Sequence, residues 1–380
     1  MEYKIARSAT LGMGKPFLIT GTWKEILTKG ALPRRKSYHS AISWRNTLFT
    51  LGGQDLREGA LEGLWMLRLD DSHPDTERWV KLKIQGGPPA ISRHSAVLNN
   101  NFMYVYGGTN TVIQYNTMFI LDLEKMIWRK ILSEDENFPP RMDSHSCVCY
   151  KGQLVFFGGY VNGYRSNLVH LFEISTESWQ VHNLPGPPAR SNQSASLHKS
   201  FLYIFGGLDE DHSALNDFWR LDLETYLWIQ ISLKGDSPAA RSGHTCIIFR
   251  NNLVLFGGIK EIGHETNELF YCNLETHEWA LIFHSEVSQD PAATNNYLAV
   301  QFNNFQVRKS VDHIKVSKIK EEEEETKEKN QILRQNEKAV VVPCARDGHS
   351  ACLIDNKMYV FGGDKHQMSF NDLYVYSIHI

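Results

Sequence analysis

The sequence predicts an all-β protein built from repeated four-stranded sheets that stack on one another. The first observation is a series of Gly-Gly pairs, the first five spaced 48 to 55 residues apart and the last after a gap of 105 residues. The second is a tryptophan that follows most pairs by 20 to 26 residues. Two landmarks that recur together at one long period indicate a repeat protein. The pairs are Gly52-Gly53, Gly107-Gly108, Gly158-Gly159, Gly206-Gly207, Gly257-Gly258 and Gly362-Gly363, and the tryptophans are Trp79, Trp128, Trp179, Trp228 and Trp279.

Each repeat contains four short strands. In residues 94–128, segments rich in Val, Ile, Tyr and Phe alternate with clusters of Asn, Gly and Asp, which is typical of antiparallel strands joined by turns. The repeats show no sustained apolar stripe at helical spacing. A single four-stranded sheet cannot bury both faces, so neighbouring sheets must stack. The Gly-Gly pair then allows a close approach of two sheets, and the tryptophan fills the wedge between them.

This combination of landmarks resembles the kelch repeat, and the resemblance covers nearly the whole chain. Kelch repeats form β-propellers with one four-stranded blade per repeat. The resemblance therefore implies an all-β, kelch-type β-propeller with six regular blades. It also places the chain beside the short kelch-only proteins, among them a kelch-motif Rab effector.

The two ends of the chain predict how the ring closes. After Gly363 the chain has 17 residues, enough for a third strand but not for a fourth with its tryptophan. Residues 22–28 form a strand-like segment with Trp23 and no Gly-Gly pair before it. We expect this segment to complete the last blade, because that closes the ring and removes its open edges. The alternative is an independent N-terminal strand.

The double-length gap has two interpretations. Residues 291–311 match residues 238–258 if one residue is deleted, but Ser310-Val311 stands in place of the Gly-Gly pair and no tryptophan follows. Residues 294–343 are then a degenerate seventh blade, which the spacing favours, or a long loop inserted into a six-bladed ring. In both cases residues 318–337, with the acidic run at 321–325, are expected to form a charged, disordered loop.

Composition favours one soluble domain over residues 1–380. The net charge of −3 and the pI of about 6.6 give no general attraction to nucleic acid or to an anionic membrane. No apolar segment suits a signal peptide or a membrane span. The six cysteines show neither a disulfide framework nor a CxxC pair. We expect a reduced, cytoplasmic and monomeric protein.

No motif in the sequence predicts catalysis, a cofactor or a metal. Phosphate-binding loops, dinucleotide fingerprints and metalloprotease motifs are missing. Five of the sixteen histidines occupy one repeated position at the start of the first strand, which indicates structural hydrogen bonding. They are His39, His94, His145, His244 and His349. We expect a protein that is not an enzyme; the alternative is a propeller enzyme such as a copper oxidase.

Basic residues precede the first strand of every regular blade. The turn before strand one and the turn after strand two must emerge on the same face, because antiparallel strands alternate in direction. A ring of arginines there would bind carboxylates bidentately. The alternative is that each arginine ties neighbouring parts of the ring together. The residues are Arg35, Arg93, Arg141, Arg190, Arg241 and Arg346, of which only the last three share one aligned position.

The loops after the Gly-Gly pairs vary in length and charge, as expected of a recognition surface on a rigid scaffold. Tyr160 and Tyr164 are the predicted amphipathic anchors for a partner. Several kelch proteins bind acidic or C-terminal peptides on this face. The resemblance therefore implies a scaffold that binds a protein or a peptide, and the alternative within the same class is a substrate receptor of a cullin ubiquitin ligase.

Overall fold

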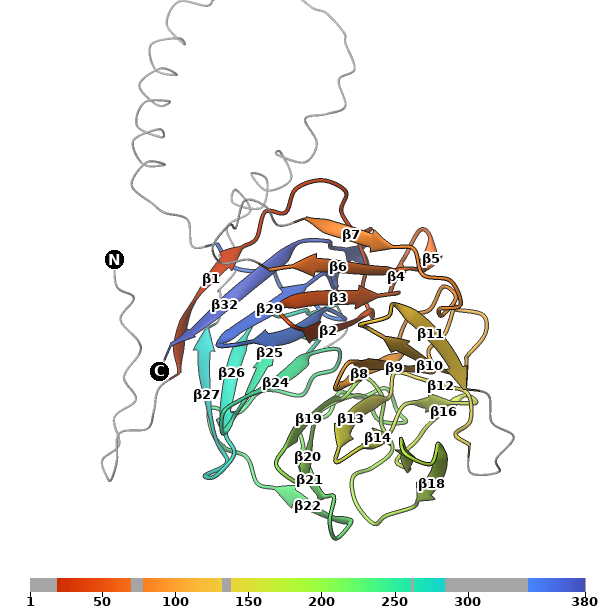
Figure 1. Cartoon of the computed structure of the whole chain (residues 1–380). Coiled ribbons are helices and arrows are strands. Elements are labelled where there is room, and N and C mark those ends of the chain that lie inside the picture. Colours follow the sequence, from red (N-terminus) through yellow and green to blue (C-terminus); the bar gives the residue numbers. More distant parts are fainter. Residues whose placement is uncertain (1–18, 70–77, 132–137, 261–262, 284–340, 380) are drawn as a thin grey trace, which may run out of the picture. The chain divides into compact units, whose positions relative to one another are not determined.

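Six sheets, each with four antiparallel strands, are arranged around a common axis in the computed structural model (Figure 1); a short parallel strand adds a fifth to one of them. The structure describes residues 19–69, 78–131, 138–260, 263–283 and 341–379. These residues up to 283 and from 343 onward form one compact unit. Residues 318–337, predicted to form a charged loop, lie outside the described ranges. The predicted single domain over residues 1–380 lies partly outside them.

The innermost strand of each blade starts directly after the repeated histidine position. Each of these strands contacts the innermost strands of both neighbouring blades, so the six strands form a closed circle. They are β2 (Ser40–Trp44), β8 (Ser95–Asn99), β13 (Ser146–Tyr150), β19 (Ser194–His198), β24 (Thr245–Phe249) and β28 (Ser350–Ile354) of blades one to six.

The second and third strands form the buried middle of each blade, because their side chains pack against both neighbouring sheets. The second strands are β3 (Thr47–Leu51), β9 (Phe102–Tyr106), β14 (Gln153–Phe157), β20 (Phe201–Phe205), β25 (Asn252–Phe256) and β29 (Lys357–Phe361). The third strands are β6 (Leu64–Arg68), β10 (Met118–Asp122), β17 (Val169–Glu173), β21 (Phe218–Asp222), β26 (Leu269–Asn273) and β32 (Leu373–His379).

The fourth strand of each blade is the outermost, and in the last blade it comes from the start of the chain. These strands are β7 (Trp79–Leu82), β11 (Ile127–Ile131), β18 (Ser178–His182), β22 (Leu227–Ile231), β27 (Glu278–Phe283) and β1 (Thr20–Glu25). Strand β1 lies beside β32 (Figure 1) and pairs with it antiparallel along its whole length, so that Trp23 is opposite Tyr376. The predicted closing strand is confirmed, with Thr20–Glu25 in place of residues 22–28.

Blades five and six are direct neighbours in the ring. The Thr245 hydroxyl lies 2.8 Å from His349 Nε2, and the Gly258 amide donates to the Arg346 carbonyl at 2.9 Å. The circle therefore closes with six blades, and no seventh sheet stands between β24 and β28. The expectation of a seventh blade between blades five and six is therefore wrong. Nearly all of the residues assigned to it, 294–343, lie outside the described part of the chain.

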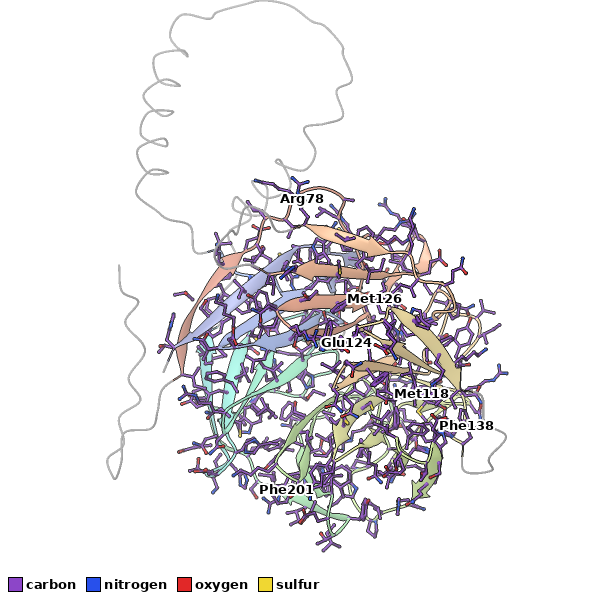
Figure 2. All side chains as sticks on the ribbon, in the orientation of Figure 1. Arg78, Met118, Glu124, Met126, Phe138 and Phe201 are labelled. Carbon is purple, nitrogen blue, oxygen red and sulfur yellow. The ribbon has the colours of Figure 1, made fainter. Side chains whose placement is uncertain are left out.

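Six apolar clusters form the core, one between each pair of neighbouring blades. Each cluster contains the tryptophan of the following blade, as predicted. Trp179 packs on Phe156 and Phe172 between blades two and three, with ring centroids 5.3 and 4.8 Å away. Met118 and Phe138 belong to the same cluster and are labelled in Figure 2, where side chains fill the spaces between the ribbons. The tryptophans thus fill the wedges that stacking leaves.

The Gly-Gly pairs lie where two sheets approach most closely. The Gly108 amide donates to the Met142 carbonyl of the next blade at 2.9 Å, and a Cβ atom on Gly107 would lie 2.5 Å from that carbonyl oxygen. Gly107 also has a φ of +67°. Both facts exclude larger residues, which explains why this position repeats as glycine.

Candidate interaction face

The loops before the innermost strands and those after the Gly-Gly pairs lie on one face of the ring, as predicted. Single β-bridges join them, for example Ser92 to Thr109 and Asp347 to Asp364. We call this surface the loop face. Its longer loops contain the short strands β4 (Gln54–Asp55), β5 (Gly59–Ala60), β12 (Met142–Asp143), β15 (Tyr160–Val161), β16 (Tyr164–Arg165), β30 (Asp364–Lys365) and β31 (Met368–Ser369); β23 (Lys234–Gly235) lies elsewhere, beside β27.

Three of the predicted arginines are buried inside their own blades. Arg190, Arg241 and Arg346 have no exposed surface. Each guanidinium donates to the carbonyl of the first glycine of its blade's Gly-Gly pair. Each also binds a carboxylate directly before the third strand, which satisfies a charge that would be costly to bury alone. The carboxylates are those of Asp217, Glu268 and Asp372, at 2.6, 2.7 and 2.7 Å.

This geometry corrects the expectation of an anion-binding ring at this aligned position, and it supports the structural alternative. The other three blades support this interpretation, because each of them lacks both the arginine and the acid at the aligned positions. At the arginine position they have Lys36, Ile91 and Met142, and at the acidic position they have Gly63, Thr117 and Leu168.

Lys36 is the exception among these replacements because it is basic and has no acid opposite. Its side chain is buried, and burial lowers its pKa to about 7. No carboxylate of the described residues forms an ion pair with it. Its ammonium nitrogen lies 5.8 Å from the Phe361 ring centroid, which is at the outer limit of a cation–π contact.

The mouth of the central channel is lined by the residue that precedes the repeated histidine. All six of these residues have a φ between 52° and 66°. Their backbone amides and carbonyls form a closed circle of six hydrogen bonds of 2.6 to 3.1 Å, each from one blade to the next. They surround a cavity of about 140 Å³ and are Tyr38, Arg93, Ser144, Asn192, Gly243 and Gly348.

Arg93 is the one predicted arginine that lines this cavity. It is half-buried, and its guanidinium carbon lies 3.8 Å from the centre of the Tyr38 ring. Arg35 and Arg141 are exposed four residues before their histidines, away from the aligned position of the buried arginines. The structure therefore separates the six predicted arginines into three buried, one axial and two peripheral residues.

The repeated histidines are structural, as predicted. Each imidazole Nε2 lies 2.8 to 2.9 Å from a serine or threonine hydroxyl of the preceding blade, for example His94 from Ser40. Burial lowers the pKa of His94 to about 3, so its ring is neutral. In blade four Gln193 takes the histidine position and donates to Ser146 at 3.2 Å.

Exposed apolar side chains gather at the tips of loops on this face. Tyr164 is 72% exposed at the turn between β15 and β16, and Val112 in blade two is 87% exposed. Leu56 of blade one and Met368 of blade six are also exposed. Since blades six, one, two and three are consecutive in the ring, these residues form an arc, which we call the apolar arc. Tyr160, the other predicted anchor, is partly covered, with the Arg165 guanidinium 5.8 Å from its ring.

Sequence reasoning missed a cluster of acids on the same face. Carboxylate oxygens of Glu265, Asp347 and Asp364 lie within 4.8 Å of one another between blades five and six. Burial and the nearby Asp364 raise the pKa of Asp347 to about 8. The signal was available in the repeats: only the last blade has an acid both two residues before the histidine and directly after the Gly-Gly pair.

In the part of the chain that the structure describes, no helix is long and apolar enough to cross a membrane.

Comparison with known proteins assigns the family. The family model described as the KLHDC2/KLHL20/DRC7 Kelch-repeats domain matches residues 17–159 and 144–306, and the Kelch motif model matches residues 345–379.

Similar proteins carry the repeat in different settings. The chain is 30% identical to acyl-CoA-binding domain-containing protein 5 of Arabidopsis thaliana, over 54% of this chain and 35% of that protein. It is 28% identical to Kelch domain-containing protein 3 of Rattus norvegicus, over 60% and 62%. It is 26% identical to host cell factor 1 of Rattus norvegicus, over 75% and 16%. The matches thus span less than two thirds of each relative. With six blades of the predicted kind and family models that match most of its length, the chain belongs to the kelch-repeat family.

Proposed function

We propose that this protein is a non-enzymatic interaction module that binds a partner protein or peptide on its loop face. The kelch-repeat relatives support a protein-interaction role. The fold supports it as well, because six interlocked blades form a rigid base from which loops of different length project.

The apolar arc is the observation that carries the proposal. Exposed apolar residues that occur singly on a surface need no explanation. Here Leu56, Val112, Tyr164 and Met368 project from four consecutive blades on the same face. The corresponding loop of blade four is polar and contains Asp209, Glu210 and Asp211. An apolar surface over blades six to three suits a partner that lies across these blades.

Arg93 adds a polar contact beside this surface. Its guanidinium is held over Tyr38 at the mouth of a small axial cavity. An arginine that is ordered by stacking loses little freedom when it binds a carboxylate. We therefore assign the contact with an acidic side chain or a C-terminal carboxylate to Arg93, in place of the three buried arginines.

The test is capture of partners from extract by the immobilised full chain. The double variant Val112→Ser, Tyr164→Ser removes the centre of the arc. Its matched control is Ile127→Ser, Leu227→Ser, which removes two side chains of similar exposure from the outer strands β11 and β22. We expect the first variant to lose the proteins that wild type captures and the control to keep them. Equal capture by both variants would contradict the proposal.

The contribution of Arg93 is tested with Arg93→Ala and the peripheral control Arg35→Ala. We expect Arg93→Ala to weaken capture and to reduce its dependence on salt, because a charge-assisted contact is screened by added ions. Arg35→Ala should change neither. If the two variants behave alike, the assignment of the carboxylate contact to Arg93 is wrong.

A further inference from the structure

The ring offers an internal comparison of its six junctions between blades. At each junction on the loop face, three positions meet. One belongs to the first blade of the junction and lies where its loop after the Gly-Gly pair turns back. The other two belong to the following blade: the residue two before its histidine, and the residue directly after its Gly-Gly pair. At the junction of blades two and three, Gln114 donates to Asp143 at 2.7 Å. At the next junction, Arg165 donates to Ser191 at 2.9 Å. A donor thus faces an acceptor at both of these polar junctions.

The junction of blades five and six departs from this rule. The same three positions are Glu265, Asp347 and Asp364, and all three are acids. Within the described residues, no lysine or arginine forms an ion pair with them. Glu265 receives the His366 backbone amide at 3.0 Å, and the His366 imidazole lies 3.2 Å from its other oxygen. Burial raises the pKa of Asp364; the Arg93 guanidinium is near enough to oppose this rise but forms no ion pair with the cluster.

Two of these acids are buried and retain oxygens without a hydrogen bond. Asp347 is 2% exposed; its Oδ2 accepts the Tyr38 hydroxyl at 2.5 Å, whereas its Oδ1 has no partner. The Glu265 side chain is 5% exposed; its Oε2 has no hydrogen bond, and the nearest basic group is the His366 imidazole at 3.2 Å. Buried acceptors are almost always satisfied by protein, water or an ion. Both residues belong to the group of three acids whose carboxylate oxygens lie within 4.8 Å of one another, so one ligand can contact both side chains.

We propose that Glu265, Asp347 and Asp364 form a binding site for a hard divalent cation of the size of Ca²⁺. Carboxylate oxygens are the ligands that such a cation prefers, at about 2.3–2.6 Å. Two ligands of one ion are then at most about 5 Å apart, and one oxygen from each of the three acids lies within 4.8 Å of the others. Mg²⁺ dehydrates reluctantly and is usually held by one or two carboxylates and several waters, so a group of three carboxylates suits Ca²⁺ better. The half-exposed Asp364 leaves a side open to the waters that complete the coordination.

The position of the site gives it a structural role. Glu265 belongs to blade five, Asp347 and Asp364 belong to blade six, and the Tyr38 hydroxyl links Asp347 to blade one. This is also the junction at which consecutive blades are separated by residues 284–342 of the sequence. A cation here joins three blades across the longest interruption of the repeat, and it should stabilise the ring because it binds the folded state only.

The site shares no residue with the proposed partner surface, although Tyr38 touches both, since it stacks on Arg93 and donates to Asp347. The apolar arc extends over blades six to three and its central residues are Val112 and Tyr164, whereas the acidic cluster lies between blades five and six. Failure of one proposal therefore leaves the other standing.

The test uses the chelator-treated full chain, calorimetric titration with CaCl₂ or MgCl₂, and thermal melting in the same solutions. We expect one saturable Ca²⁺ site, a rise in melting temperature with Ca²⁺, and a smaller response to Mg²⁺. Tb³⁺, which replaces Ca²⁺, should show luminescence sensitised by Tyr38. An absence of binding and of any melting shift at millimolar Ca²⁺ overturns the proposal, and means that the acids share protons instead.

Two variants and a control locate the site. Glu265→Gln reproduces at this junction the Gln114–Asp143 pair of blades two and three, so it should fold at least as well as wild type without cation. We expect it to bind Ca²⁺ roughly tenfold or more weakly. Asp364→Asn, which changes the half-exposed member, should behave likewise. Asp211→Asn removes an exposed acid of the blade-four loop and should leave binding unchanged. Equal affinity in all four proteins overturns the assignment to these acids.

Discussion

The backbone amide of Tyr38 donates a 2.6 Å hydrogen bond to the carbonyl oxygen of Gly348, although the two residues are 310 positions apart in the chain. This bond completes the circle of six around the channel mouth. A second closure lies at the rim, where β1 pairs with β32. The ring is therefore fastened at the axis and at the edge by residues from opposite ends of the sequence.

The rim closure predicts a large effect of Trp23→Ala. Trp23 packs on Phe256 and Tyr376, with ring centroids 5.2 and 5.0 Å away, and so holds β1 against blades five and six. We expect a loss at the lower end of the about 3–5 kcal/mol that large aromatic truncations cost in cores, because Trp23 is only partly buried. Urea unfolding measures it. An unchanged midpoint would show that the closing strand does not contribute to stability.

The buried ion pairs predict that Arg346→Ala is a folding defect. The substitution leaves the partly buried Asp372 carboxylate and the buried Gly362 carbonyl without their donor. Removing one partner of such a pair costs about 3–5 kcal/mol. The exposed Arg35→Ala should cost less than about 0.5 kcal/mol. Chemical denaturation of both variants decides; equal stability would mean that the guanidinium is not needed inside the blade.

Lys36 predicts a rise of stability with pH. Its folded pKa of about 7 lies below the value of about 10.4 in an unfolded chain. Between these two values the unfolded state binds more protons, so the free energy of unfolding increases with pH. Below pH 7 Lys36 is protonated in both states, so its contribution to the free energy of unfolding no longer changes with pH.

We therefore compare wild type with Lys36→Met by urea unfolding at pH 7 and at pH 9.5. From pH 7 to pH 9.5 the free energy of unfolding of wild type should rise, relative to that of Lys36→Met, by on the order of a few kcal/mol. The control is Lys83→Met, which changes an exposed lysine. The difference in unfolding free energy between this variant and wild type should be the same at both pH values. A constant difference between wild type and Lys36→Met would show that Lys36 keeps its ordinary pKa.

The histidine circle predicts that glutamine is the best replacement. Gln193 already takes this position in blade four, where its Nε2 donates to Ser146 and to the Phe157 carbonyl. His94→Gln should therefore lose clearly less stability than His94→Ala, which leaves the Ser40 hydroxyl unpaired at a cost of about 1–3 kcal/mol. Thermal melting of the two variants compares them directly, and equal melting temperatures would contradict a hydrogen-bonding role.

The fold could be predicted from the sequence because its determinants repeat. Gly107 and Trp179 act through local geometry that recurs in each blade, so their spacing reveals the unit. The closing strand could be predicted because the last repeat lacks a tryptophan that Trp23 supplies.

The site was harder to predict because the residue type at one aligned position does not show whether its side chain is buried. Arg190 looks like a surface arginine until it is compared with Asp217, which lies 27 residues later and is present only where the arginine is. The acidic cluster combines Glu265 with residues from the other side of a long interruption. Such pairs depend on which sheets are neighbours, and only the closed ring determines that.

Hydrogen–deuterium exchange of the full chain, with and without a captured partner, tests partner binding on the loop face directly. We expect slower exchange in the loops that carry the apolar arc, at residues 54–60, 109–114, 160–165 and 364–369, with outer strands β11 and β22 unaffected. Protection confined to those outer strands, with unchanged exchange in the four loops, would contradict it.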